Sequence, residues 1–130
     1  MTQPNPKDLL EKLVDTDLEF ADPSQDLRNR KVTDSSGKHI GHVSALFVDR
    51  QDRKIRFLQV GAGGFLGIGE REFLVPVEDI VRSTPDEVFI NHTLEHVVNA
   101  PPYTPSLIPM DENVWIPYYG YYGYVPYWKR

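Results

Sequence analysis

The sequence predicts a small all-β domain, and three observations lead to this prediction. Short stretches rich in β-branched and aromatic residues recur between residues 31 and 90. Turn-forming residues separate them, as Asp34 and Gly37 do after the first stretch. The chain has 130 residues, which suits one domain with an arm or a tail. Short strands at this spacing are typical of a small barrel or sandwich.

Six strands are expected in the central part of the chain. They cover residues 31–33, 38–48, 54–60, 72–75, 81–83 and 87–90. Single helical turns are expected at residues 77–80 and 93–98, and Thr93 suits the N-cap of the second turn. Gly41 lies inside the second strand, where glycine often marks a bulge or a sharp bend.

The expected core consists of the apolar residues of these strands and turns. Apolar and polar residues do not alternate cleanly after Gly41, so the face on which each of them lies stays open there. The expected core residues are Val32, Ile40, Val43, Leu46, Val48, Ile55, Leu58, Val60, Leu74, Val75, Ile80, Val88 and Ile90.

Residues 1–26 are interpreted as an acidic helical arm. Asn5 can cap a helix and Pro6 suits its first turn. A narrow apolar stripe would follow, formed by Leu9, Leu10 and Leu13.

The charge of the chain is concentrated in this arm. Residues 1–27 hold seven acidic and two basic side chains, whereas residues 28–100 hold ten of each. The net charge of the whole chain is −5. A neutral body with an acidic arm is a poor electrostatic match for a polyanion, so nucleic-acid binding is not favoured.

Residues 103–130 are interpreted as an irregular aromatic tail. All seven tyrosines and both tryptophans lie here. Residues 103–109 are expected to pack along the barrel, and the distal run is expected either to be disordered or to bind a partner. Tyrosine and tryptophan favour interfaces. The proposed contact residues are Tyr118, Tyr119, Tyr121, Tyr122, Tyr124 and Trp128.

The glycine-rich stretch at residues 61–71 looks like a phosphate-binding loop but lacks the required spacing. Leu66 stands where the dinucleotide fingerprint needs its third glycine, and a strand rather than a helix is expected to follow. The glycines are better explained by a tight connection that presents Phe65, Leu66 and Ile68. These three side chains either plug the barrel or face a partner subunit.

No motif in the chain indicates catalysis, a cofactor or a metal. His92, Glu95 and His96 match an H-x-x-E-H pattern, but His92 precedes the expected helical turn and no third ligand is evident. A basic cluster interleaved with Asp49 and Asp52 is interpreted as a solvated turn rather than an RNA site. It comprises Arg50, Arg53, Lys54 and Arg56.

A cytoplasmic location without direct membrane insertion is expected. The chain has no cysteine, so folding needs no oxidising compartment. It shows no signal peptide and no apolar run of about 18 residues that would span a membrane.

Three segments of the chain resemble the PRC-barrel family. The first follows the pattern V-x-D-x-x-G-x-x-I-G-x-V, with anchors at Val32, Asp34, Gly37, Ile40, Gly41 and Val43. The second is GGFLGIGEREFLVP at residues 63–76, and the third is LEHVVNAP at residues 94–101. Asn29 stands where many relatives have glycine. The resemblance covers about residues 27–102.

The resemblance implies a small, strongly bent antiparallel β-barrel at residues 27–102. It implies an interaction module rather than an enzyme, often a homodimer, with no catalytic residues to carry over and a protein partner still to be identified. Two alternatives are implied by particular branches of the family. One is an RNA-associated role in ribosome maturation, and the other is an accessory role near a membrane electron-transfer complex of the photosynthetic type.

Overall fold

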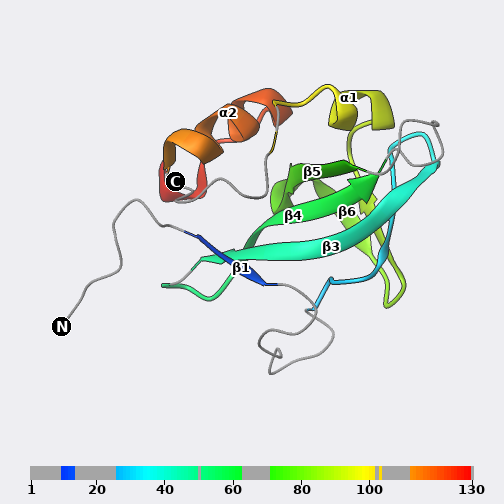
Figure 1. The fold of residues 1–130 in the computed structure, drawn as a ribbon, viewed down its shortest axis with the longest axis horizontal. Coiled ribbons are helices and arrows are strands. Elements are labelled where there is room, and N and C mark those ends of the chain that lie inside the picture. The colour runs from blue at the N-terminus through cyan, green and yellow to red at the C-terminus, as the bar shows by residue number, and fades with distance from the viewer. Residues whose placement is uncertain are drawn as a thin grey trace.

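One curled sheet carries the fold, as the computed structural model shows (Figure 1). The structure describes residues 10–13, 26–49, 51–62, 71–101, 103 and 112–129. The strands in these residues are β1 (Leu10–Leu13), β2 (Lys31–Thr33), β3 (His39–Asp49), β4 (Ile55–Ala62), β5 (Arg71–Pro76), β6 (Ile80–Ser83) and β7 (Glu87–Ile90). The six strands expected in the central part of the chain are therefore confirmed.

The strand order is β5-β4-β3-β2-β7-β6, and β1 pairs with β3 beside β2. All the pairs are antiparallel except β2 with β7, so the expectation of a wholly antiparallel barrel is wrong at this pair. A hydrogen bond links the segments that follow the two strands. Asp34 follows β2, and its carboxylate accepts a hydrogen bond from the backbone of Leu94, just after β7.

The expected N-terminal helix is wrong where the structure describes it. Leu10–Leu13 is a strand whose partners are residues 46–49 of β3. β3 is longer than β2, so its second half has a free edge on that side, and β1 pairs there. Leu10 is buried against Phe47. An isolated helix of this length is marginal in water, whereas the sheet edge offers ready hydrogen-bond partners.

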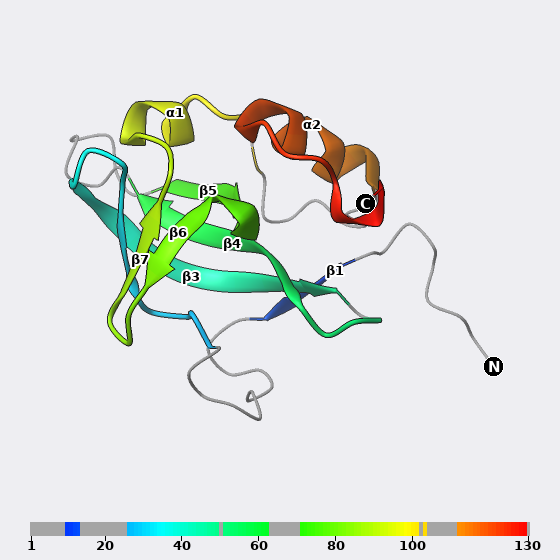
Figure 2. The ribbon, with the colours of Figure 1, turned by 180° about the vertical axis from the view of Figure 1, so that it is seen from behind.

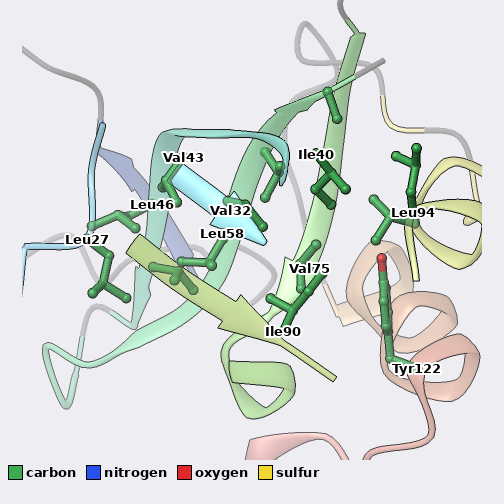
Figure 3. Close-up of a cluster of buried hydrophobic side chains, with 14 of the residues drawn as sticks. Leu27, Val32, Ile40, Val43, Leu46, Leu58, Val75, Ile90, Leu94 and Tyr122 are labelled. Carbon is green, nitrogen blue, oxygen red and sulfur yellow. The ribbon is translucent and has the colours of Figure 1, made fainter. Parts of the chain in front are cut away.

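The sheet buries side chains on both faces. Alternate residues of β3 and β4 point into the barrel, including Leu46 and Leu58, and form the inner core (Figure 3). Their neighbours Phe47 and Phe57 lie in a second cluster on the outer face. Register shifts interrupt this alternation in both strands, which explains why the sequence pattern after Gly41 was unclean.

The expected core is confirmed, with two differences. Ile55 and Ile80 pack against the inner core but are only partly buried. Leu74 is buried, yet it belongs to the outer cluster.

Gly41 is required by a close approach between β3 and β4. A Cβ atom placed there would lie 1.8 Å from the Gly61 carbonyl oxygen. The register between β2 and β3 also shifts next to this position, as expected for glycine inside a strand.

Short helices connect and cover the strands. The 3₁₀ helix η3 (Val77–Asp79) joins β5 to β6, and α1 (Leu94–Val98) follows β7 with Thr93 as its N-cap. Both helical turns were expected. The C-terminal elements are α2 (Glu112–Tyr122) and the 3₁₀ helix η4 (Tyr127–Lys129). Figures 1 and 2 show α2 lying along the side of the sheet formed by β4 and β5.

The expected irregular tail is therefore wrong for residues 112–122, which are helical. The aromatic residues Trp115, Tyr118, Tyr119 and Tyr122 are spaced i, i+3, i+4 and i+7, which places them on one helical face. This signal was present in the sequence but was obscured by the tyrosines between them and by Pro117.

Candidate functional site: the surface that holds the aromatic segment

The outer face of the sheet carries an apolar surface, which we call the outer platform. It consists of Phe47 on β3, Phe57 on β4 and Leu74 on β5. Three different strands supply these side chains because each points away from the barrel interior at its position in the pleat. Residues 112–129, which we call the aromatic segment, cover this platform.

Trp115 is the central contact between the aromatic segment and the outer platform. Its ring centroid lies 5.0 Å from that of Phe47 and 4.7 Å from that of Phe57, and its side chain is 0% exposed. Tyr119 meets Phe57 edge to face at 4.9 Å. Tyr118 is also buried in this cluster. Aromatic pairs in such geometries add about 0.5–1.5 kcal/mol each beyond the burial of area.

A polar chain of hydrogen bonds borders the outer platform. The Tyr103 hydroxyl donates to Gln59 Oε1 at 2.7 Å, and Gln59 Nε2 donates to Ser44 Oγ at 3.0 Å. The Ser44 hydroxyl in turn lies 2.7 Å from Glu72 Oε2. Tyr103 also meets Phe47 edge to face, so the expected packing of this residue on the barrel is confirmed.

The end of the aromatic segment is held by a guanidinium group. The Arg56 side chain lies 4.0 Å from the centroid of the Tyr127 ring, which is a cation–π contact. Asp49 and Asp52 each form an ion pair with Arg56, at 3.2 and 3.3 Å. The carboxylates that interleave with the basic cluster therefore neutralise Arg56 locally.

A second group of contacts, which we call the histidine group, holds the middle of the aromatic segment. It consists of Asp79 on η3, His92 before α1 and His96 on α1. His92 Nδ1 lies 2.5 Å from Asp79 Oδ1, and the two imidazole rings stack with centroids 4.2 Å apart. The Asp79 side chain is 0% exposed, so its carboxylate depends on these partners.

Three tyrosines of the aromatic segment contact the histidine group. The Tyr121 ring stacks on His96 at 4.2 Å, and its hydroxyl donates to the His96 carbonyl oxygen at 2.7 Å. Tyr122 lies edge-on to both imidazoles. The Tyr124 hydroxyl donates to Asp79 Oδ1 at 2.7 Å. The segment is thus attached by side chains from several elements of the barrel.

Burial changes the ionisation of several groups at this surface. Burial raises the pKa of Tyr118 to about 12 and raises the pKa of Tyr119 and of Tyr122 still further. Burial lowers the pKa of His96 below its ordinary value, and the neighbouring His92 acts in the same direction. Each of these shifts favours the neutral side chain in the docked segment.

Polar atoms at the junction lie buried without a hydrogen-bond partner. They are Asp79 Oδ2, His96 Nε2 and the Tyr122 hydroxyl oxygen, and Tyr122 reaches into the inner core beside Leu94 (Figure 3). An unmade hydrogen bond of this kind costs about 1–3 kcal/mol. Within the described ranges, no group of three or more His, Cys, Asp or Glu side chains is placed to bind a metal ion.

The structure brings together the tail residues named from the sequence. Tyr118, Tyr119 and Tyr122 are buried against the chain's own barrel. The remaining three, Tyr121, Tyr124 and Trp128, are partly buried. Whether any of the six contacts a partner stays a prediction. Phe65, Leu66 and Ile68 lie outside the described residues.

Sequence reasoning missed the outer platform and the histidine group as parts of one surface. Phe47 and Phe57 lie in strands for which only the residues that point into the barrel were expected in the core. Asp79 follows Glu78 in a short helical turn, and nothing local marks it as the buried member of the pair. In the part of the chain that the structure describes, no helix combines the length and apolar character needed to span a membrane.

The fold and this surface define a small, curled β-domain with an aromatic docking face. Comparison with known families gives the same class, because the model of the PRC-barrel domain matches residues 22–97. The chain belongs to the PRC-barrel domain family. A search of curated proteins gives no match.

Proposed function

We propose that this chain is a non-enzymatic protein-interaction module whose binding surface is the outer platform. One observation carries the proposal: the platform already holds a helix, α2, through aromatic residues at positions i, i+3, i+4 and i+7. The membership of the PRC-barrel family supports a role as an interaction or associated module. In the isolated chain the surface is occupied by the chain's own segment.

The chemistry of the surface supports recognition of a helix. Apolar anchors at one-turn spacing that enter an apolar surface are a recurrent mode of peptide binding. Gln59 and Arg56 border the platform with polar contacts, in the arrangement of an apolar centre and a polar rim. We therefore propose that the partner presents a helix with a large aromatic side chain in place of Trp115.

A second copy of the chain is the simplest partner of this kind, because each copy carries a platform and an aromatic segment. We propose self-association as a homodimer, either through this surface or through Phe65, Leu66 and Ile68. Mass measurement in solution tests this. Loss of a dimer on Trp115→Ala places the contact on the platform, and loss on Leu66→Asp places it on the glycine-rich loop. A monomer at every concentration contradicts self-association.

The binding surface is tested with a labelled peptide of residues 112–129. Fluorescence anisotropy measures its binding to the full chain and to the full-length Trp115→Ala variant. In this variant the chain's own aromatic segment binds the platform more weakly. We expect tighter binding to the variant, because its platform is less occupied. A peptide carrying alanine at positions 115 and 119 is the control and should not bind. Absence of binding of the native peptide to the Trp115→Ala chain contradicts the proposal.

A further inference from the structure

His96 lies where α1 and the connection before it meet α2. It belongs to α1, its ring stacks on His92 on one side, and Tyr121 of α2 stacks on it with an interplanar angle of 24°. Tyr122 lies edge-on at 5.2 Å. The backbone carbonyl of His96 accepts a hydrogen bond from the Tyr121 hydroxyl. The aromatic segment cannot leave the barrel without breaking this stack.

The two histidines differ in their partners. His92 has the Asp79 carboxylate as a hydrogen-bond partner at Nδ1. His96 Nε2 is buried and has no hydrogen-bond partner. A proton on His96 would therefore place a charge on a ring whose Nε2 is buried without a hydrogen-bond partner. The charge on His96 would also lie against the stacked imidazole ring of His92.

We propose that His96 is a proton-operated latch on the aromatic segment, which holds the segment on the barrel when neutral and releases it when protonated. The inference rests on the proposed function, because it assigns regulation to the same surface. Release separates Trp115 from Phe47 and Phe57, since Trp115, Tyr121 and Tyr122 lie on one continuous helix. Acid would thus uncover the outer platform for a partner.

The other charged and titratable groups at the junction set the balance. A hydrogen bond with the Tyr121 backbone favours a charge on His96, and so does the Asp79 carboxylate. The face of Tyr121 offers a cation–π contact to the same charge. Burial and the adjacent His92 oppose the charge and prevail, so the pKa of His96 is lowered. Tyr122 and Tyr124 are neutral at the pH concerned, since burial raises the pKa of both.

The direction of the pH effect follows from this. In the released state His96 loses the cover of Tyr121 and Tyr122, so its pKa returns toward the ordinary value of 6.5. In the docked state its pKa is lower, so the released state binds more protons. Docking is therefore complete above about pH 6.5 and weakens as the pH falls toward the docked value. The docking constant falls up to about tenfold for each unit of difference between the two pKa values.

The chain provides its own reporter for this release. Both of its tryptophans, Trp115 and Trp128, lie in the aromatic segment. We expect tryptophan emission of the full chain to shift to longer wavelength between about pH 8 and about pH 5, with a midpoint below about pH 6.5. His96→Phe keeps a stacking ring that takes no proton, and His96→Gln supplies an uncharged polar side chain. Both variants should lose the shift.

The control is His39→Phe, which removes an exposed histidine at the start of β3 by the same substitution and should keep the shift. Amide hydrogen exchange in β2 and β7 follows the barrel during the titration and should stay protected. Three results would overturn the latch. The emission of the wild type stays unchanged, or both His96 variants keep the shift. In the third result, β2 and β7 lose protection together with the shift.

The latch and the proposed function fail separately. The emission experiment contains no partner, so it tests the latch alone. Binding of the peptide of residues 112–129 at about pH 5 tests the platform. A clear emission shift without peptide binding overturns the interaction surface and leaves the latch in place. Peptide binding to the Trp115→Ala chain at neutral pH, without any emission shift in the wild type, overturns the latch alone.

Discussion

Asp34 Oδ2 accepts a hydrogen bond from the backbone N–H of Leu94 at 2.9 Å, across 60 residues of the chain. The same carboxylate accepts from the N–H groups of Ser36 and Lys38 in the turn after β2. It thereby ties the first segment of the family resemblance to the third. The contact also fixes the start of α1, the helix that carries His96.

Replacement of Asp34 tests this tie. We expect Asp34→Ala to lower the free energy of unfolding by about 2–3 kcal/mol, because three backbone N–H groups, the buried one of Leu94 among them, lose a charged acceptor. Urea unfolding measures the change. Asp86→Ala removes an exposed carboxylate from another turn and should change the stability by less than about 0.5 kcal/mol. Equal effects of the two substitutions would show that the tie does not stabilise the fold.

The ionisation of Asp34 predicts an acid limit of stability. Burial acts to raise the pKa of this carboxyl, but the hydrogen bonds from Ser36, Leu94 and Lys38 outweigh it and hold the pKa below the ordinary 3.8. The folded state thus binds fewer protons than the unfolded state. Its contribution is present above about pH 4 and is lost as the pH falls through the folded value. In Asp34→Asn this acid-dependent part of the unfolding curve should be reduced.

Truncation of Trp115 tests the outer platform. We expect Trp115→Ala to lower the free energy of unfolding of the segment by about 3–5 kcal/mol, because a fully buried indole is replaced by a cavity. Ile116 on the next position of α2 is 38% exposed, and Ile116→Ala should have an effect of less than about 1 kcal/mol. Denaturant unfolding compares the two variants. A small loss for Trp115→Ala would mean that the segment does not stabilise the barrel.

Two glycines distinguish a close backbone approach from an open position. Gly41→Ala places a methyl group 1.8 Å from the Gly61 carbonyl oxygen, so β3 and β4 must separate. We expect a loss of several kcal/mol or failure to fold. Gly120 in α2 has no atom within 4 Å of the added methyl, and Gly120→Ala should stabilise the helix by about 0.5–1 kcal/mol. Thermal melting of the two variants should shift in opposite directions.

The buried tyrosines predict an alkaline transition of the aromatic segment. Burial raises the pKa of Tyr118 to about 12, whereas the ordinary value is 10.0. The docked state therefore keeps protons that the released state loses. Docking is complete below about pH 10 and weakens as the pH rises above it. Tyrosinate absorbance should show the native chain titrating later than the chain in urea. Ionisation of all seven tyrosines together near pH 10 in the native chain would contradict the burial of the segment.

Local chemistry explains why most of the barrel was predictable. Turn residues and apolar alternation define the strands, and Thr93 marks the start of α1 as expected. Asn29 has a φ of 68°, a left-handed conformation that glycine adopts without strain and that asparagine tolerates better than most residues. Each of these features depends on residues that are close together in the sequence, so it can be recognised without knowledge of the fold.

The parts that were not predictable depend on contacts between distant segments. The strand β1 pairs with a free edge of β3. The strand β2 pairs in parallel with β7, and Asp34 meets Leu94 beyond the ends of these two strands. The aromatic segment is helical because a platform formed by three strands receives it. No local pattern records these partners, although the spacing of Trp115, Tyr118, Tyr119 and Tyr122 was available as a helical signal.

The most direct test of the interaction surface is an amide chemical-shift map of the full-length Trp115→Ala chain during addition of the unlabelled peptide of residues 112–129. If the outer platform is the binding surface, the largest changes fall on Phe47, Phe57, Gln59 and Leu74. The edge strand β6 should be unaffected. The proposal that this barrel binds its partners through the outer platform would be contradicted by changes confined to β6 or to residues 63–70. It would equally be contradicted if no chemical shift changed.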